Sequence, residues 1–257
     1  FDDDAIIAGQ GTIGLELAEQ VPDLEAVICP IGGGGLIGGI AIALKSLLPD
    51  VRIVGVQTAR LPSMQAAMKQ HEPVTLPPAT TIADGIGVRR VGARNLEIAE
   101  KYLDEYVTVD EEEIASAILM LLEKEKTVAE GAGAAASAAL IQKRTSLQGK
   151  RVACLVCGGN IDPIFLTRII ERGLVKDGRL VRIRVQASDN PGVLHAVTGV
   201  IAKLRANVIE ITHERAYFNV RLGNTVIDLT LETRGADHVS ELLQALTEAG
   251  YQYDRIT

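Results

Sequence analysis

The sequence predicts an α/β protein in two parts: a parallel sheet with flanking helices, followed by a smaller domain of the order βαββαβ. Short apolar runs alternate with helical patterns over residues 1–172, which is the order expected of an α/β sheet. Beyond a polar connection near residue 175, strand and helix patterns follow in a different order. Aromatic residues make up only 3% of the chain, with no Trp, and small aliphatic residues dominate, which suits tightly packed α/β layers.

The elements of the first part follow from apolar runs and helical periodicity. An amphipathic helix is predicted over residues 6–20, with Thr12 as a candidate cap. Continuous apolar runs at residues 26–30 and 51–57 predict strands buried on both faces, as in a parallel sheet. The remaining expected elements are helices at 36–48, 63–70, 96–103 and 130–142, and strands at 105–109 and 151–156.

Two other segments of the first part bear on function. Residues 71–92 are rich in Pro, Thr, Gly and Ala and predict a long irregular loop, which we expect to border the site. The acidic run at residues 110–113 places negative charge at the start of a helix, and we expect it only to cap that helix.

The second part begins after a polar connection at residues 171–180, so we expect domains at 1–175 and 180–257. Its βαββαβ order is ferredoxin-like. The expected elements are strands at 181–187, 208–216 and 219–233, helices at 192–204 and 236–249, and a final short strand.

Charge and composition argue against several classes of partner. The net charge is −7 and no dense Lys/Arg run occurs, so nucleic acid is not an expected partner. No apolar stretch looks able to cross a bilayer and the N-terminal residues are acidic, so we expect no membrane contact and a cytoplasmic protein. Cys154 and Cys157 have the Cys-x-x-Cys spacing that supplies two of the four ligands of a zinc site. No second pair of Cys or His residues lies at a matching distance in the sequence, so no metal is expected there.

Four consecutive glycines, Gly32 to Gly35, stand between a predicted strand and a predicted helix. Bare backbone N–H groups and the helix dipole can converge there on a phosphate. The spacing matches neither the dinucleotide GxGxxG motif nor a P-loop. A tight turn without a ligand would explain one or two glycines, so phosphate binding is the better interpretation.

Five motifs together resemble threonine dehydratases of the fold-type-II pyridoxal-phosphate (PLP) enzymes, over residues 1 to about 172. The motifs are Gly9-Gln10-Gly11-Thr12, Gly32 to Gly35, Ala83-Asp84-Gly85, Glu130-Gly131-Ala132-Gly133 and Cys157-Gly158-Gly159-Asn160. The resemblance implies PLP as cofactor and the conversion of L-threonine, and of L-serine too, to 2-oxobutanoate or pyruvate and ammonia. It assigns Gly32, Gly33, Gly34, Gly35, Leu36, Gly85, Glu130, Cys157 and Gly158 to cofactor binding.

In that family a Ser or Cys at the position of Cys157 faces the pyridine nitrogen. A neutral group there makes a weaker electron sink than the Asp of other PLP enzymes, which would favour loss of water over transamination. Cys157 could instead be packed core. Its place at the carboxyl end of a predicted strand, before two glycines, favours a ligand contact.

The family's catalytic lysine lies in a Ser-Phe-Lys-x-Arg-Gly-like segment, and this sequence contains none. We therefore expect an N-terminal segment of the same enzyme to be missing, no catalytic residue in this chain, and no activity of the chain alone. Lysines in helix-like charged contexts are not expected to replace it; these are Lys45, Lys69, Lys101, Lys124 and Lys126.

Some relatives bind a divalent cation through a Glu and an Asp at the positions of Gln57 and Ser63. A hard cation needs such carboxylates, so we expect no magnesium or calcium there. Asp84 is expected to hold its own loop.

Residues 181–257 resemble an ACT domain, with Ser188 to Leu194 at the position of its effector loop. The resemblance implies an amino-acid effector and a homo-oligomer that pairs through ACT domains. His195 and His213 could contact a ligand, although lone histidines are more often surface or capping residues. The expected effector-binding residues are Asn190, Pro191, Gly192, Val193 and Leu194.

Two alternatives stay open. The chain could be a non-catalytic regulatory protein that uses both sites to bind ligands. It could also belong to a serine dehydratase or serine racemase, because the methyl group that separates threonine from serine is worth only about 1 to 3 kcal/mol in a pocket.

Overall fold

The computed structural model describes residues 1–215 and 220–256. The chain divides into two compact units, Phe1–Leu166 and Thr167–Thr257. The division falls inside helix α7 (Pro163–Lys176). The domain boundary expected at residues 175–180 stays a prediction.

Helix α7 corrects one expectation. Residues 171–176 were expected in a polar connection, but they form the last turns of this helix. Its start is held by Asp162, whose side chain accepts hydrogen bonds from the N–H groups of Ile164 (2.7 Å) and Phe165 (3.0 Å). The capped start and the apolar residues that follow it extend the helix through the polar residues at its end.

The first unit contains a four-stranded sheet in the order β3-β2-β1-β4, and every strand pair in it is parallel. All five residues of β1 are buried, as are the last six of β2, because helices cover both faces of the sheet. This confirms the predicted parallel sheet. The strands are β1 (Ala26–Pro30), β2 (Arg52–Thr58), β3 (Glu105–Val109) and β4 (Val152–Cys154).

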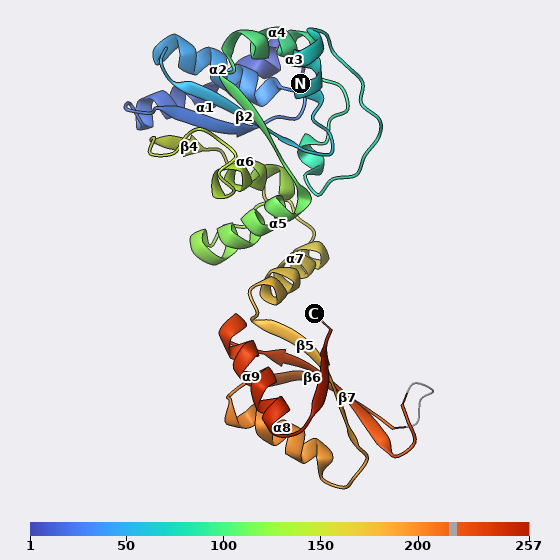
Figure 1. The fold of residues 1–257 in the computed structure, drawn as a ribbon. Coiled ribbons are helices and arrows are strands. Elements are labelled where there is room, and N and C mark those ends of the chain that lie inside the picture. Colours follow the sequence, from blue (N-terminus) through green and yellow to red (C-terminus); the bar gives the residue numbers. More distant parts are fainter. Residues whose placement is uncertain (216–219, 257) are drawn as a thin grey trace. The chain divides into compact units, whose positions relative to one another are not determined.

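Helices α1, α2 and α4 lie over one face of this sheet and α5 and α6 over the other (Figure 1). Helix α6 is built almost entirely of Ala and Gly and is buried nearly all round, which lets its backbone approach its neighbours closely. The helices are α1 (Asp4–Gln20), α2 (Gly35–Leu47), α3 (Ser63–Gln70), α4 (Ala93–Tyr102), α5 (Glu111–Met120) and α6 (Gly131–Ile141).

The cap of α1 differs from the expectation. Asp3 caps the helix, because its carboxylate accepts from the N–H groups of Ala5 (2.9 Å) and Ile6 (3.3 Å). Thr12 lies inside the helix and its hydroxyl donates to the carbonyl of Gly9 at 2.8 Å, so the assignment of Thr12 as cap is wrong. A Ser or Thr hydroxyl satisfied by the preceding turn is not available to start a helix.

The second unit contains an antiparallel four-stranded sheet in the order β6-β7-β5-β8. Buried and exposed residues alternate along β5, because α8 and α9 cover one face only (Figure 1). This confirms the βαββαβ prediction. The elements are β5 (Leu180–Ser188), α8 (Val193–Lys203), β6 (Asn207–Glu214), β7 (Asn224–Glu232), α9 (Ala236–Glu248) and β8 (Gln252–Arg255).

Residues 216–219, where two of the expected strands were to end and begin, lie outside the described residues. Within the described part of the chain, no helix combines the length and the apolar character that a membrane crossing requires.

Candidate functional site

The glycine loop (Gly32 to Gly35) joins the end of β1 to the start of α2 and lines a cavity of about 250 Å³ in the first unit. Four other segments reach the same cavity: the first residue of the chain, the loop after α3, the start of α6 and the residues after β4. The cavity is lined by Phe1, Pro30, Gly32, Gly33, Gly34, Gly35, Leu36, Gly85, Ile86, Val88, Glu130, Ala132 and Cys157. The structure thus brings together nearly all of the residues that the motifs assigned to the cofactor.

Close neighbours explain why this loop is made of glycine. Gly34 has a φ of +103°, and a Cβ there would lie 2.7 Å from the Cβ of Asn95. A Cβ on Gly33 would lie 2.2 Å from the ring of Phe1. The backbone therefore stays bare where α2 begins, and the first N–H groups of a helix have no partner within it. Helix starts with such free N–H groups commonly bind anions.

Gly85 forms the facing wall of the cavity. A Cβ on Gly85 would lie 3.0 Å from the Cβ of Ala132 and 3.5 Å from Oε1 of Glu130. The 3₁₀ turn that carries Gly85 (Asp84–Ile86) interrupts the long irregular loop, which borders the site as expected. Oδ1 of Asp84 accepts from the N–H of Gly85 at 2.9 Å, so Asp84 does hold its own loop.

Glu130 and Cys157 complete the cavity. The N–H of Glu130 donates to the carbonyl of Gly158 (3.1 Å), and its Oε2 accepts from the N–H of Asn160 (3.1 Å). Gly158, with a φ of +119°, packs directly against the Glu130 side chain. Burial raises the pKa of the Cys157 thiol, which is therefore neutral at pH 7.

Several residues near the cavity had no sequence signal as part of a motif. Asn95 is buried, and its Nδ2 donates to the carbonyl of Phe1 at 2.9 Å. The Asn95 side chain packs against Gly34 and so helps to fix the glycine loop. The only sequence signal for this role is that Asn95 is a polar residue on the face of α4 that is otherwise buried and apolar. Ile86 and Val88 line the cavity beside Gly32, and only their place in the long loop pointed to them.

No lysine of the described chain lines this cavity. Lys45, for example, lies on α2 and pairs with Asp104 at 3.0 Å. Among the described residues there is also no group of three or more His, Cys, Asp or Glu side chains that could hold a metal.

Gln57 and Ser63, the two residues at the family's cation position, are buried. Oε1 of Gln57 accepts from the N–H of Gln65 at 3.0 Å, while the Gln57 amide nitrogen and the Ser63 hydroxyl have no partner among the described residues. Neither side chain is anionic, and the absence of a cation stays a prediction.

A second cavity, of about 620 Å³, lies in the second unit where β5 leads into α8. Asn190 to Val193 line it together with residues of β5 and with Gly250 to Gln252. Gly192 has a φ of +91°, which suits a glycine immediately before a helix. Leu194 packs against the core of the unit instead. None of the described histidines lines this cavity, and His238 is a buried residue with both ring nitrogens bonded.

Comparison with known proteins identifies a family for each of the two parts of the chain. A family model described as pyridoxal-phosphate dependent enzyme matches residues 1–158, and an ACT domain model matches residues 177–249. An L-threonine ammonia-lyase of Thermotoga maritima is 47% identical over 252 residues, which cover 98% of this chain and 63% of that protein.

Two solved structures are also similar. The processed form of threonine deaminase isoform 2 from Solanum lycopersicum has a TM-score of 0.62 and 32% identity over 66% of this chain and 50% of that one. A serine racemase of maize has a TM-score of 0.59 and 33% identity over 66% of this chain and 53% of that one.

The family match covers more than half of the chain and confirms the resemblance that the motifs indicated, although the chain spans only 63% of the length of the Thermotoga relative. The chain therefore belongs to the pyridoxal-phosphate dependent enzymes and carries an ACT domain after the catalytic-domain segment.

Proposed function

We propose that this chain is part of an enzyme that converts L-threonine to 2-oxobutanoate and ammonia with PLP as cofactor. The observation that carries the proposal is the cavity in which the glycine loop, Gly85, Glu130 and Cys157 converge. Support comes from the 47% identity with a protein named L-threonine ammonia-lyase.

The residues present fit PLP. The bare backbone of the glycine loop at the start of α2 offers N–H groups to a phosphate. When bound, PLP supplies an electron sink for a carbanion at the substrate Cα. Cys157 lines the same cavity and would present a neutral thiol to the cofactor ring, because burial raises its pKa. A neutral partner stabilises a protonated ring nitrogen less than a carboxylate does, which favours loss of water.

Glu130 orients the segment that carries Cys157, through its bonds to Gly158 and Asn160. The cofactor-binding roles of Gly32 to Gly35, Leu36, Gly85, Glu130, Cys157 and Gly158 belong to this proposal.

L-Serine is a second proposed substrate. The likeness to a serine racemase structure favours it, and one methyl group separates the two amino acids. Comparing ammonia release from threonine and from serine at equal concentration, with chiral analysis of the remaining serine, separates deaminase from racemase activity.

We propose further that an amino acid binds at the second cavity and regulates the enzyme, with Asn190 to Val193 as its contacts. The N–H groups at the start of α8 offer the same type of anion site to the effector's carboxylate. Pairing of ACT domains is supported by edge strand β6, where Ile209 and Ile211 are exposed, since exposed apolar edges usually have a partner.

The test is ammonia release from threonine by the 257-residue chain and by a longer protein that carries the family's lysine segment. We expect release above background only from the longer protein, because no lysine of the described chain lines the cavity. Release by the 257-residue chain would contradict the expectation that this chain is inactive alone. PLP binding without any release by the longer protein would favour the non-catalytic alternative.

A further inference from the structure

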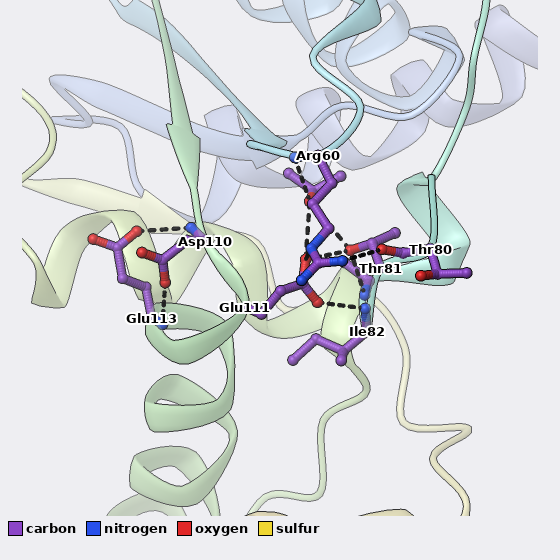
Figure 2. Close-up of polar contacts among 9 residues, drawn as sticks. Arg60, Thr80, Thr81, Ile82, Asp110, Glu111 and Glu113 are labelled. Carbon is purple, nitrogen blue, oxygen red and sulfur yellow. Dashed lines mark hydrogen bonds and ion pairs between the residues drawn. The ribbon is translucent and has the colours of Figure 1, made fainter. Parts of the chain in front are cut away.

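Glu111 is the first residue of α5, directly after the capping residue Asp110. Its side chain leaves the helix and turns toward the long loop after α3 (Figure 2). Oε2 accepts from the N–H of Ile82 at 2.7 Å, and Oε1 accepts from the Thr81 hydroxyl at 2.9 Å. Only 18% of this side chain is exposed. A residue that merely added charge to a helix start would leave its carboxylate in water.

Arg60 approaches the same loop from the end of β2. Its Nε lies 3.5 Å from Oε1 of Glu111, and its Nη1 donates to the carbonyl of Thr80 at 3.2 Å. The buried hydroxyl of Thr58 lies 3.1 Å from that of Thr81. Residues 80–82 are therefore held by backbone and side-chain bonds to two elements that are distant in sequence.

The held segment leads directly into the wall of the glycine-loop cavity. A Cβ on Gly131 would lie 2.0 Å from the carbonyl oxygen of Ile82, so this loop packs on the backbone of α6. Ala83 is fully buried, and Gly85 and Ile86, which follow it closely in the chain, line the cavity. A shift at residue 82 would thus move the wall that faces Gly32 and Glu130.

We propose that Glu111 is a positioning residue for the cofactor site: it holds residues 80–82 so that Gly85 and Ile86 close the cavity opposite the glycine loop. Glu111 does not line the cavity, so it acts through the loop. This inference rests on the proposed PLP site.

Glu113, two residues further along α5, provides a matched control. It completes the capping box by accepting from the N–H of Asp110 at 2.8 Å, and it also accepts from Arg144. Figure 2 shows its carboxylate on the Asp110 side of the helix start, away from Thr81 and Ile82. Glu113→Gln therefore perturbs the same helix start without touching the loop.

The experiment compares the parent chain with Glu111→Ala, Glu111→Gln and Glu113→Gln by PLP titration and by hydrogen exchange of residues 80–87. Glu111→Ala should weaken PLP binding about tenfold and speed exchange at the Ile82 amide about tenfold, because that amide loses a charged acceptor. Glu111→Gln keeps one acceptor oxygen and should recover part of both. Glu113→Gln should lower thermal stability while changing PLP affinity less than about twofold.

Equal PLP affinity and equal exchange in the parent and in Glu111→Ala would overturn the inference. Equal losses of PLP affinity in Glu111→Ala and Glu113→Gln would also overturn it, because a general loss of stability would then explain both results. If the parent chain itself bound no PLP, the proposed cofactor site of this chain would fail, and the exchange rates alone would decide whether Glu111 holds the loop.

Discussion

Gly34 combines two constraints that no other residue type satisfies. Its φ is +103°, and a Cβ there would meet Asn95 at 2.7 Å. Gly34→Asp adds bulk and negative charge where backbone donors meet a phosphate. We expect this variant to lose saturable PLP binding in a fluorescence titration.

Gly149→Asp is the matched control for backbone strain. Gly149 also has a positive φ, +79°, but a Cβ there would meet no described atom within 4 Å. This variant should bind PLP as the parent does. Equal PLP affinity in the two variants would mean that the glycine loop is not the phosphate site.

Cys157 offers a second test at the scale of single residues. Burial raises its pKa, and only the thiolate reacts with iodoacetamide. Its alkylation rate should keep rising with pH beyond about 8.5, where an unperturbed thiol begins to level off. Mass spectrometry of the Cys157 peptide measures this rate, with a free peptide as reference. A rate that levels off as early as in the peptide would contradict the buried position.

PLP should slow the alkylation of Cys157 if the two share the cavity. Cys157→Ser should keep most of the cofactor affinity, because a hydroxyl is also neutral at pH 7. Cys157→Ala should weaken binding less than Gly34→Asp does. An unchanged alkylation rate at saturating PLP would remove Cys157 from the site.

At the scale of elements, strands β5 and β7 are tied by a two-bonded ion pair on the open face of their sheet. Nε and Nη2 of Arg184 each donate to Asp228 at 2.7 Å. The hydrogen bonds from Arg184 hold the pKa of Asp228 below its ordinary value. A lowered folded-state pKa means that the carboxylate stabilises the fold above about pH 4 and that this contribution disappears as pH falls through the lowered value.

Asp228→Asn should therefore lower the stability of the second unit by about 1 kcal/mol at pH 7, because Arg184 is half exposed. The difference from the parent should shrink below about pH 4. Native-state hydrogen exchange of the amides in β5 and β7 measures the stability of the second unit separately from that of the first. Asp254→Asn, at an exposed position on β8, is the control and should have less effect. A difference that persisted undiminished in acid would show that charge is not its cause.

At the scale of the whole molecule, the exposed apolar edge of β6 predicts self-association. Ile209→Lys places a charge at a side chain that is 58% exposed and should shift the sedimentation of the chain toward monomer. Ile164→Lys, at another exposed position on α7, should leave the association unchanged. A parent chain that sediments as a monomer at high concentration would contradict pairing through the ACT domain.

The effector prediction also belongs to the whole protein, since it links two sites. We expect a branched-chain amino acid, isoleucine first among them as the end product downstream of 2-oxobutanoate, to bind in the second cavity. Calorimetry of the chain should detect its binding, and Asn190→Ala should weaken the affinity about tenfold by removing a polar group from the cavity. No heat from any branched-chain amino acid would contradict this assignment.

The sequence alone determined the parallel and βαββαβ sheets, the order of most elements, and the motif residues that meet at one cavity, with the exception of Gly158. It missed helix α7. Buried runs such as residues 26–30 and the glycine loop are local signals whose periodicity or composition has only one good structural solution. The capping role of Asp110 and Glu113 was equally local, because the two residues bond to each other's backbone within one helical turn. The expectation that the acidic run only caps its helix was wrong for Glu111, whose carboxylate bonds to Thr81 and Ile82.

Only the tertiary structure decided what Glu111 contacts, because its partners Thr81 and Ile82 lie about thirty residues earlier in the sequence. The same holds for Asn95, which reaches Phe1 from the other end of a long segment. Side chains of one charged or polar type look alike in a sequence. Packing of the elements decides which of them faces water, which completes a cap and which holds a loop against the site.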